Sequence, residues 1–352
     1  MTAVLNDVER FIRASYLGHS WLLVLLGAGS VEADLGPTPI LGLMLIAFNF
    51  HCFGYVHNNL IDYPIDRTAT LRSEDPLVKG QIGIPTAWAI ALLQIPLSFS
   101  VAVLLNVEPA ALYTLTIGYL ATIGYNVYGK RCPIPPLTDA LQGVAWSSLA
   151  TFGALAVGDL NWISSIPIAF GFSYIFLING VHGGLRDLEN DLRHGKKTTA
   201  TFFGAEPIPG SGQVKSTPKL LSFAYLAFVA LVLPGALIQL AGYLPYNQFE
   251  AVSIASVWLA TQALAFQRLA RVVATAEPCR NLQISRNQLP LLLPPLILLT
   301  PMMAVPLKII VVVGFVLPFF LFNATVRSKA LSALSMLVAG LRRNPRRGGN
   351  NL

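Results

Sequence analysis

Charged residues are scarce in this sequence. Only 12% of its 352 residues are Asp, Glu, Lys or Arg, whereas a soluble domain has about 25%. The three cysteines show neither C-x-x-C nor Cys/His spacing, so nothing indicates a zinc site or a disulfide framework. The net charge is +7, but the basic residues are scattered between apolar segments and form no basic face. We therefore expect neither a soluble domain nor a nucleic-acid partner.

Long apolar segments dominate instead. Hydrophobic residues make up 54% of the chain, and segments long enough, or nearly so, to cross about 30 Å of hydrocarbon follow one another. They cover 15–31, 39–57, 84–107, 109–128, 138–157, 163–182, 219–241, 249–272 and the proline-interrupted segment 288–326, which could cross once or twice. The sequence therefore predicts an all-α fold: a polytopic bundle of nine or ten transmembrane helices in the lipid bilayer. We expect a single domain over 1–326 and a basic, flexible tail over 327–352.

The distribution of basic residues predicts the orientation of the bundle. The expected connections at 32–38, 158–162 and 242–248 contain no Lys or Arg, and almost all positive charge lies in the alternate connections. The positive-inside rule places the basic connections in the cytoplasm. The arginine-rich tail follows the same rule, which favours an even number of crossings.

A first acidic segment follows the second expected helix. Asn58, Asp62 and Asp66 occur at intervals of four residues. On a helix this spacing places their oxygens along one face, within reach of shared ions. Pro64 cannot donate to the Leu60 carbonyl, so we expect the helix to end or kink there.

A second acidic segment follows the sixth expected helix. Asp187 and Asp191 are again four residues apart, with Glu189 between them and basic residues on both sides. Mg²⁺ binds a few carboxylates together with phosphate oxygens and water, and neighbouring Lys or Arg neutralises the remaining charge. A single pair of this kind would fit a solvated loop at the lipid headgroups equally well. Two pairs on one side of the membrane favour a metal-bridged phosphate site.

The first segment resembles a motif of the UbiA superfamily of intramembrane prenyltransferases. The family pattern N-D-x-x-D-x-x-x-D is matched by Asn58, Asp62 and Asp66, with Asn59 in place of the second acid. The resemblance implies a helical bundle around a central cavity, in which the two acidic segments face each other.

Three further elements are similar to that family. Its R-P-L-x-x-G-x-I element resembles D-P-L-V-K-G-Q-I at 75–82, and its Tyr and Lys-Arg element resembles Y-N-V-Y-G-K-R at 125–131. Its second acidic motif is approximated by Asp187 and Asp191 followed by G-K-K-T, although two glycines at 183–184 stand where Lys and Asp are common.

The resemblance also implies an isoprenyl diphosphate substrate and two or more Mg²⁺ ions. The catalytic acids that it implies are Asp62, Asp66, Asp187 and Asp191, and the implied metal ligands are these four and Asn58. The residues expected to bind the diphosphate are Asn58, Arg72, Lys79, Lys130, Arg131 and Lys197. Further candidates near the motifs are Asn59, Tyr125, Glu189, His57 and His182.

The leading functional prediction is transfer of the prenyl group to a lipophilic or aromatic acceptor through an allylic carbocation. A membrane terpene cyclase of the same superfamily, acting on farnesyl or geranylgeranyl diphosphate, is an alternative because it needs the same ionisation site. A transporter with acidic ion sites is a second alternative, although its acids would be expected near the membrane midplane and these lie at helix ends.

Overall fold

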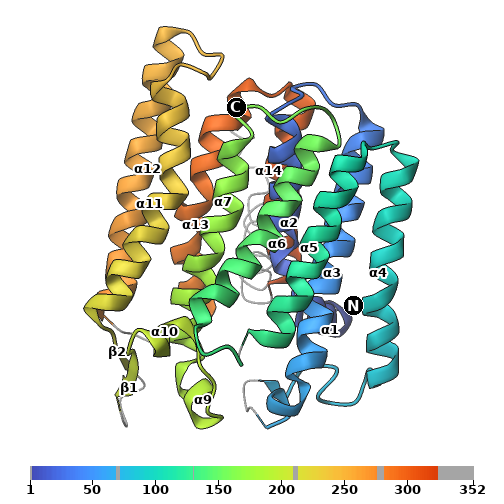
Figure 1. The fold of residues 1–352 in the computed structure, drawn as a ribbon, viewed down its shortest axis with the longest axis vertical. Coiled ribbons are helices and arrows are strands. Elements are labelled where there is room, and N and C mark those ends of the chain that lie inside the picture. Colours follow the sequence, from blue (N-terminus) through green and yellow to red (C-terminus); the bar gives the residue numbers. More distant parts are fainter. Residues whose placement is uncertain (1, 69–71, 130, 209–212, 276–280, 324–352) are drawn as a thin grey trace, which may run out of the picture.

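The protein is a bundle of helices in a computed structural model that describes residues 2–68, 72–129, 131–208, 213–275 and 281–323 (Figure 1). The helices of the first half are α1 (Thr2–Ile12), η1 (Ala14–Tyr16), α2 (Leu17–Gly29), α3 (Pro37–Asp66), α4 (Ile84–Leu104), α5 (Pro109–Tyr128) and α6 (Pro135–Leu155). Proline begins α3, α5 and α6, where its fixed φ suits the first helical position and its missing N–H is not needed.

The second half has shorter elements between its long helices. They are α7 (Ser165–Ile175), the π-helix η3 (Phe176–Gly183), α8 (Gly184–Arg186), α9 (Leu188–Arg193), α10 (Thr199–Phe202), β1 (Glu206–Ile208), β2 (Gln213–Lys215), α11 (Pro218–Leu240), α12 (Gln248–Thr275), α13 (Asn281–Leu299), η4 (Thr300–Met302) and α14 (Val305–Phe322). The two strands form an antiparallel hairpin in which Pro207 lies opposite Val214.

Successive long helices run in alternate directions, so their connections gather at two ends of the bundle (Figure 1). The motif end has the connections from α3 to α4, from α5 to α6 and from η3 to α11. The opposite end has the connections from α2 to α3, α4 to α5, α6 to α7, α11 to α12 and α13 to α14. These opposite-end connections contain no Lys or Arg, and Lys308 lies one turn into α14. Both acidic segments thus lie at the basic end, as the sequence predicts.

Fewer helices are long and apolar enough to cross a membrane than the sequence suggests. Within the described ranges, six helices are long and apolar enough to cross a membrane, or seven if the bent pair formed by α1 and α2 counts as one span. The expected nine or ten are not confirmed, because α2 is short, α5 and α6 contain polar residues such as Asn126 and Asp139, and the apolar part of α13 with η4 is the shorter Pro290–Met302. The proline-rich segment is resolved into two helices, α13 and α14, joined by η4.

The helix α3 continues through the whole first acidic segment. It includes Pro64 and ends at Asp66, so of the two expected effects of this proline, an end or a kink, the end is wrong. The proline lies in the last turn, where its missing N–H removes a single bond, to the Leu60 carbonyl. The first acidic segment is therefore helical, whereas the second contains the break between α8 and α9 at Asp187.

The helix α2 lies inside the bundle. Residues 22–26 are each at most 1% exposed, because this helix is apolar on every side and packs against α3, α6, α7 and α14. A Cβ on Gly27 would lie 2.0 Å from the Ala150 oxygen, and one on Gly153 would lie 2.0 Å from the Val24 oxygen. This reciprocal contact holds α2 against α6 and fixes the position from which the chain turns into α1.

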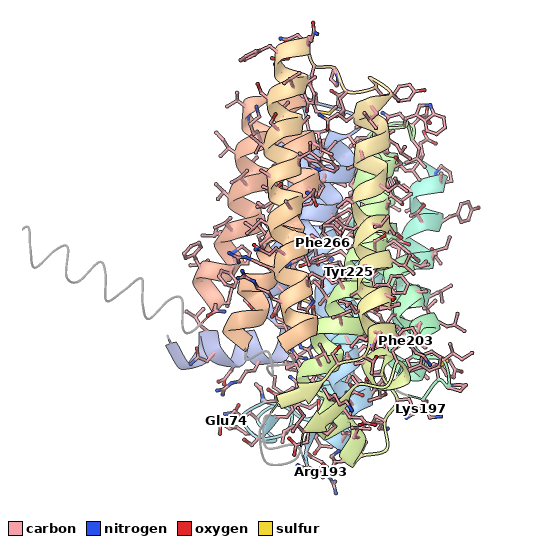
Figure 2. The ribbon with its side chains drawn as sticks, turned by 90° about the vertical axis from the view of Figure 1, so that its left-hand side faces the viewer. Glu74, Arg193, Lys197, Phe203, Tyr225 and Phe266 are labelled. Atoms are coloured by element: carbon pink, nitrogen blue, oxygen red, sulfur yellow. The ribbon has the colours of Figure 1, made fainter. Side chains whose placement is uncertain are left out.

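The amphipathic helix α1 lies across the motif end (Figure 2). Its axis is bent by 67° from that of the segment containing α2. Arg13, between the two helices, has a φ of 50°, a left-handed conformation that is uncommon for a residue other than glycine. The bend places the last turn of α1, with Arg10 and Phe11, against α3 and the connection that follows it.

Candidate active site

The first acidic segment is divided between two faces of α3. Asn58 and Asp62 face α5: the Asn58 amide donates to the Asp62 carboxylate and to the Asn126 oxygen, each at 3.4 Å. Asp62 is 9% exposed. The spacing thus brings Asn58 and Asp62 together, as the sequence predicts, but Asp66, expected on the same face, lies with Asn59 instead.

Asn59 and Asp66 lie on the other face, toward α1. The Asn59 amide donates to the Phe11 carbonyl at 2.8 Å, which ties α3 to the N-terminal helix. Asn59, Asp66 and Asp75 line a pocket of about 10 Å³ under α1, enough for about one water molecule. The Asn59 amide thus packs α3 against α1 and does not belong to the face of α3 that contains Asp62.

The second acidic segment begins directly after the π-helix η3. Such segments interrupt α-helices frequently at functional sites. The Arg186 guanidinium donates to both oxygens of Asp187, at 2.7 and 2.5 Å. Asp191 is 3% exposed. His182 is buried, and its Nδ1 contacts the Leu177 carbonyl at 2.7 Å, which fixes Nδ1 as the protonated nitrogen.

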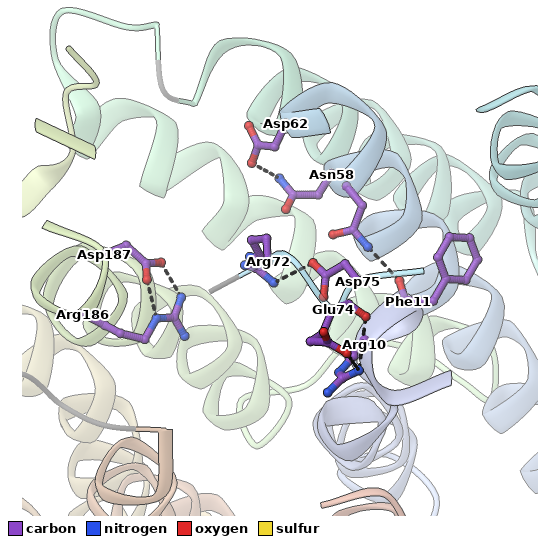
Figure 3. Close-up of polar contacts among 10 residues, drawn as sticks. Arg10, Phe11, Asn58, Asp62, Arg72, Glu74, Asp75, Arg186 and Asp187 are labelled. Atoms are coloured by element: carbon purple, nitrogen blue, oxygen red, sulfur yellow. Dashed lines mark hydrogen bonds and ion pairs between the residues drawn. The ribbon is translucent and has the colours of Figure 1, made fainter. Parts of the chain in front are cut away.

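The two acidic segments converge at the motif end. The Thr68 hydroxyl, just after the first segment, contacts Nε2 of His194, just after the second, at 3.0 Å. Figure 3 shows Arg72 in the region between the Asn58–Asp62 pair and the Arg186–Asp187 pair.

Arg13 lies near charged residues of both segments. It lies within electrostatic range of Asp66 in the first segment, of Arg186 in the second and of Arg72 between them. Its guanidinium carbon lies 4.9 Å from the centroid of the Tyr55 ring, a cation–π contact. The sequence prediction did not include Arg13 among the site residues, because its charge was used only to predict the orientation of the bundle. Its place directly before the first apolar segment was the available signal.

A second set of polar contacts joins α5 to η3 and α6 to α10. The Asn179 amide donates to the Tyr125 hydroxyl at 3.2 Å, and the Thr199 hydroxyl donates to Asp139 in a short hydrogen bond. Tyr125 lies within electrostatic range of both Asp62 and Asp139. Asp139 was also missed, because it stands alone in an apolar segment with no spacing that marks it.

The connection between α3 and α4 has its own ion pairs. Arg72 pairs with Asp75 at 3.5 Å, and Glu74 pairs with Lys79 at 2.5 Å and with Arg10 of α1 at 3.4 Å. Burial raises the pKa of Asp75, with Arg72 acting in the opposite direction. The hydrogen bond from Lys79 lowers the pKa of Glu74. These pairs hold the connection against α1 beside the site.

Comparison with known proteins identifies the family. Residues 20–278 match the family model described as the UbiA prenyltransferase family. The chain belongs to the UbiA prenyltransferase family.

Individual relatives agree with this assignment. The digeranylgeranylglyceryl phosphate synthase of Sulfurisphaera tokodaii is 26% identical over 178 residues, which are 50% of this chain and 61% of that synthase. The 4-hydroxybenzoate octaprenyltransferase of Pseudoalteromonas translucida is 26% identical over 259 residues, 71% of this chain and 78% of that enzyme. The structure of a UbiA homologue from Archaeoglobus fulgidus bound to GPP and Mg²⁺ has a TM-score of 0.57 at 17% identity, covering 90% of this chain and 100% of that one. This last likeness shows the fold.

Several of the predicted site residues lie on the surface of this UbiA-family bundle, away from the four aspartates. Glu189 pairs with Arg193 at 2.8 Å, and both side chains are 69% exposed. Lys197 and Arg131 are also exposed, and Figure 2 shows Lys197 and Arg193 at the periphery of the motif end. Lys130 lies outside the described residues.

The chemistry of the acidic side chains fits Mg²⁺ as a candidate ligand of the motif end. No group of three His, Cys, Asp or Glu side chains lies close enough to hold a metal ion within the part of the chain that the structure describes. The donors are oxygens in pairs, such as Asn58 with Asp62. Mg²⁺ typically uses one or two carboxylates plus substrate phosphates and water rather than a complete protein cage. The donor set therefore suits a metal–diphosphate complex.

Proposed function

We propose that this chain transfers a prenyl group from an isoprenyl diphosphate to a lipophilic or aromatic acceptor. Mg²⁺ would be held by Asn58, Asp62, Asp66, Asp187 and Asp191. The proposal is carried by the convergence of two acidic segments, 126 residues apart in the chain, at the contact between Thr68 and His194. The relatives support it: a homologue's structure contains GPP and Mg²⁺, and the name of another relative specifies an aromatic acceptor.

Arginines supply the positive charge that a leaving diphosphate requires. Mg²⁺, two ions or more in this proposal, would neutralise the charge that develops on the diphosphate oxygens. Arg13 and Arg72 add fixed positive charge between the two segments. Arg186 makes a bidentate pair with Asp187, and a guanidinium with this geometry can equally bind a phosphate.

An aromatic face is available for the allylic cation that ionisation produces. The Tyr55 ring holds the Arg13 guanidinium over one face at 4.9 Å, so an allylic cation would have to meet its opposite face. Such a face stabilises a cation by about 0.5 to 2 kcal/mol. Tyr125, close to Asp62, is a second ring beside the ionisation site.

The bundle would cross the membrane ten times in this proposal. The crossings are α2, α3, α4, α5, α6, α7 with η3, α11, α12, α13 and α14. The motif end would face the cytoplasm because the opposite-end connections contain no Lys or Arg. An even number of crossings places the basic tail on the same side, which agrees with the positive-inside rule.

Terpene cyclisation is the second candidate. It is favoured by the glycines at 183–184, where the family commonly has Lys and Asp, and by the Asn59 amide, which faces α1. Incubation of the purified protein with Mg²⁺ and farnesyl or geranylgeranyl diphosphate, with and without acceptors, separates the two. Consumption of diphosphate only with a phenol, an aromatic acid or a lipophilic alcohol supports transfer. A cyclic hydrocarbon without acceptor assigns the cyclase, and no Mg²⁺-dependent consumption in any mixture contradicts both.

A further inference from the structure

Asn126 makes a set of hydrogen bonds that the proposed chemistry does not use. It lies near the end of α5 and is 7% exposed. Its amide nitrogen contacts the Gly54 carbonyl at 3.2 Å and Nδ1 of His57 at 2.9 Å. Its oxygen accepts from the Asn58 amide at 3.4 Å. All of its polar atoms are thus directed at one turn of α3.

The orientation of these amides follows from the Gly54 carbonyl. A backbone carbonyl only accepts hydrogen bonds, so the atom of Asn126 that faces it must be the amide nitrogen. The oxygen of Asn126 then faces Asn58, which must present its own amide nitrogen. The contact with Asp62 agrees with this orientation, because a carboxylate oxygen accepts the hydrogen bond that the Asn58 amide nitrogen donates.

The second polar atom of the Asn58 amide is its oxygen, Oδ1. With its nitrogen directed at Asn126 and Asp62, its Oδ1 points away from both of these partners. A reversed amide would present N–H groups to a metal ion and could not coordinate it. We infer that Asn126 is a positioning residue that holds the Asn58 carboxamide with its oxygen toward the metal–diphosphate site. This inference rests on the proposed function.

His57 is fixed by the same contact. Its Nδ1 accepts from Asn126, so Nε2 carries the proton of the neutral ring. The ring is stacked on Phe53, with centroids 5.2 Å apart and an interplanar angle of 9°. His57 therefore supports Asn126 from the core side and makes the amide orientation harder to reverse.

The test is a double-mutant cycle on metal binding. Binding of Mn²⁺ in the presence of inorganic pyrophosphate is measured by electron paramagnetic resonance of the free ion. Asn126→Leu should weaken this binding about 10- to 100-fold, the usual effect of removing a partner that orients a metal ligand. In an Asn58→Asp background the same change should have less than about a twofold effect, because a carboxylate presents an oxygen in either orientation.

A matched control and a second variant complete the experiment. Thr122→Val removes a buried hydroxyl one turn earlier in α5, which donates only to the Gly118 carbonyl, and it should leave binding unchanged. If Asn126→Leu does not fold, Asn126→Ala takes its place in the same cycle. An equal loss in both Asn58 backgrounds, or no loss in either, overturns the inference.

The two proposals can fail separately. If Asp62→Asn and Asp187→Asn both bind Mn²⁺ with pyrophosphate like the unmodified protein, the proposed site is wrong. If both lose binding while Asn126→Leu binds normally, the site stands and the positioning role of Asn126 is refuted.

Discussion

Replacing Asp187 by Asn should separate the role of this residue in turnover from its role in stability. Asp187 accepts two hydrogen bonds from Arg186, but the two side chains are 33% and 30% exposed. Solvent screens a pair of this kind, so we expect the folded state to lose only about 1 kcal/mol. Loss of a carboxylate that holds the metal–diphosphate complex should cost about 3 to 5 kcal/mol of transition-state stabilisation, or about two to four orders of magnitude in rate.

The assay is consumption of prenyl diphosphate by protein in lipid nanodiscs at saturating Mg²⁺, with thermal unfolding measured on the same samples. Asp159→Asn is the matched control, because it removes an exposed carboxylate at the opposite end of the bundle. We expect it to leave turnover unchanged. More than about a tenth of normal turnover in Asp187→Asn would contradict the magnitude derived above, and so would a loss explained fully by unfolding.

Three further predictions concern the architecture around the site. A Thr68→Cys/His194→Cys pair should be bridged by a short bifunctional thiol reagent, seen as a mobility shift, because the Thr68 hydroxyl and Nε2 of His194 are 3.0 Å apart in the native protein; labelling of both cysteines without bridging would place the segments apart. Gly153→Val should lower the unfolding temperature in a calorimetric scan by an amount corresponding to about 1 to 3 kcal/mol, because its side chain would meet the backbone of α2; an unchanged transition would contradict this packing. The ion pair of Glu74, whose pKa is lowered, should hold α1 in place above pH 4.5 and release it as the pH falls through the lowered pKa. Amide hydrogen exchange of α1, corrected for its intrinsic pH dependence, should show this release, and Glu74→Gln should lack the protection throughout that range. Protection that does not change with pH in the unmodified protein, or full protection in Glu74→Gln, would refute it.

The spacing of the acids and the charges of the connections could be predicted from the sequence. Four-residue intervals between carboxylates and the segregation of Lys and Arg depend only on local order along the chain. They therefore indicated correctly that both acidic segments lie at the basic end. The continuation of α3 past Pro64 could not be predicted in this way. The effect of a proline depends on its place in the helix, here one turn from the end, and spacing alone does not reveal that place.

The partners of the candidate residues could not be predicted from the sequence. Asn59 and Asn58 are adjacent and chemically identical, yet one binds α1 and the other faces α5. Asn126 is 68 residues from Asn58, and Arg13 reaches Arg186 only through the fold. Contacts of this kind depend on how helices pack against one another, and no local pattern encodes them.

The most direct test of the central claim is a crystal structure with Mn²⁺ and a non-hydrolysable prenyl diphosphate, in which the metal ions are located by anomalous scattering. We predict anomalous peaks between Asp62 of α3 and Asp187 or Asp191 of the second segment, bridged by a single diphosphate. Peaks bound by one segment alone, or a diphosphate at the opposite end of the bundle, would contradict the account.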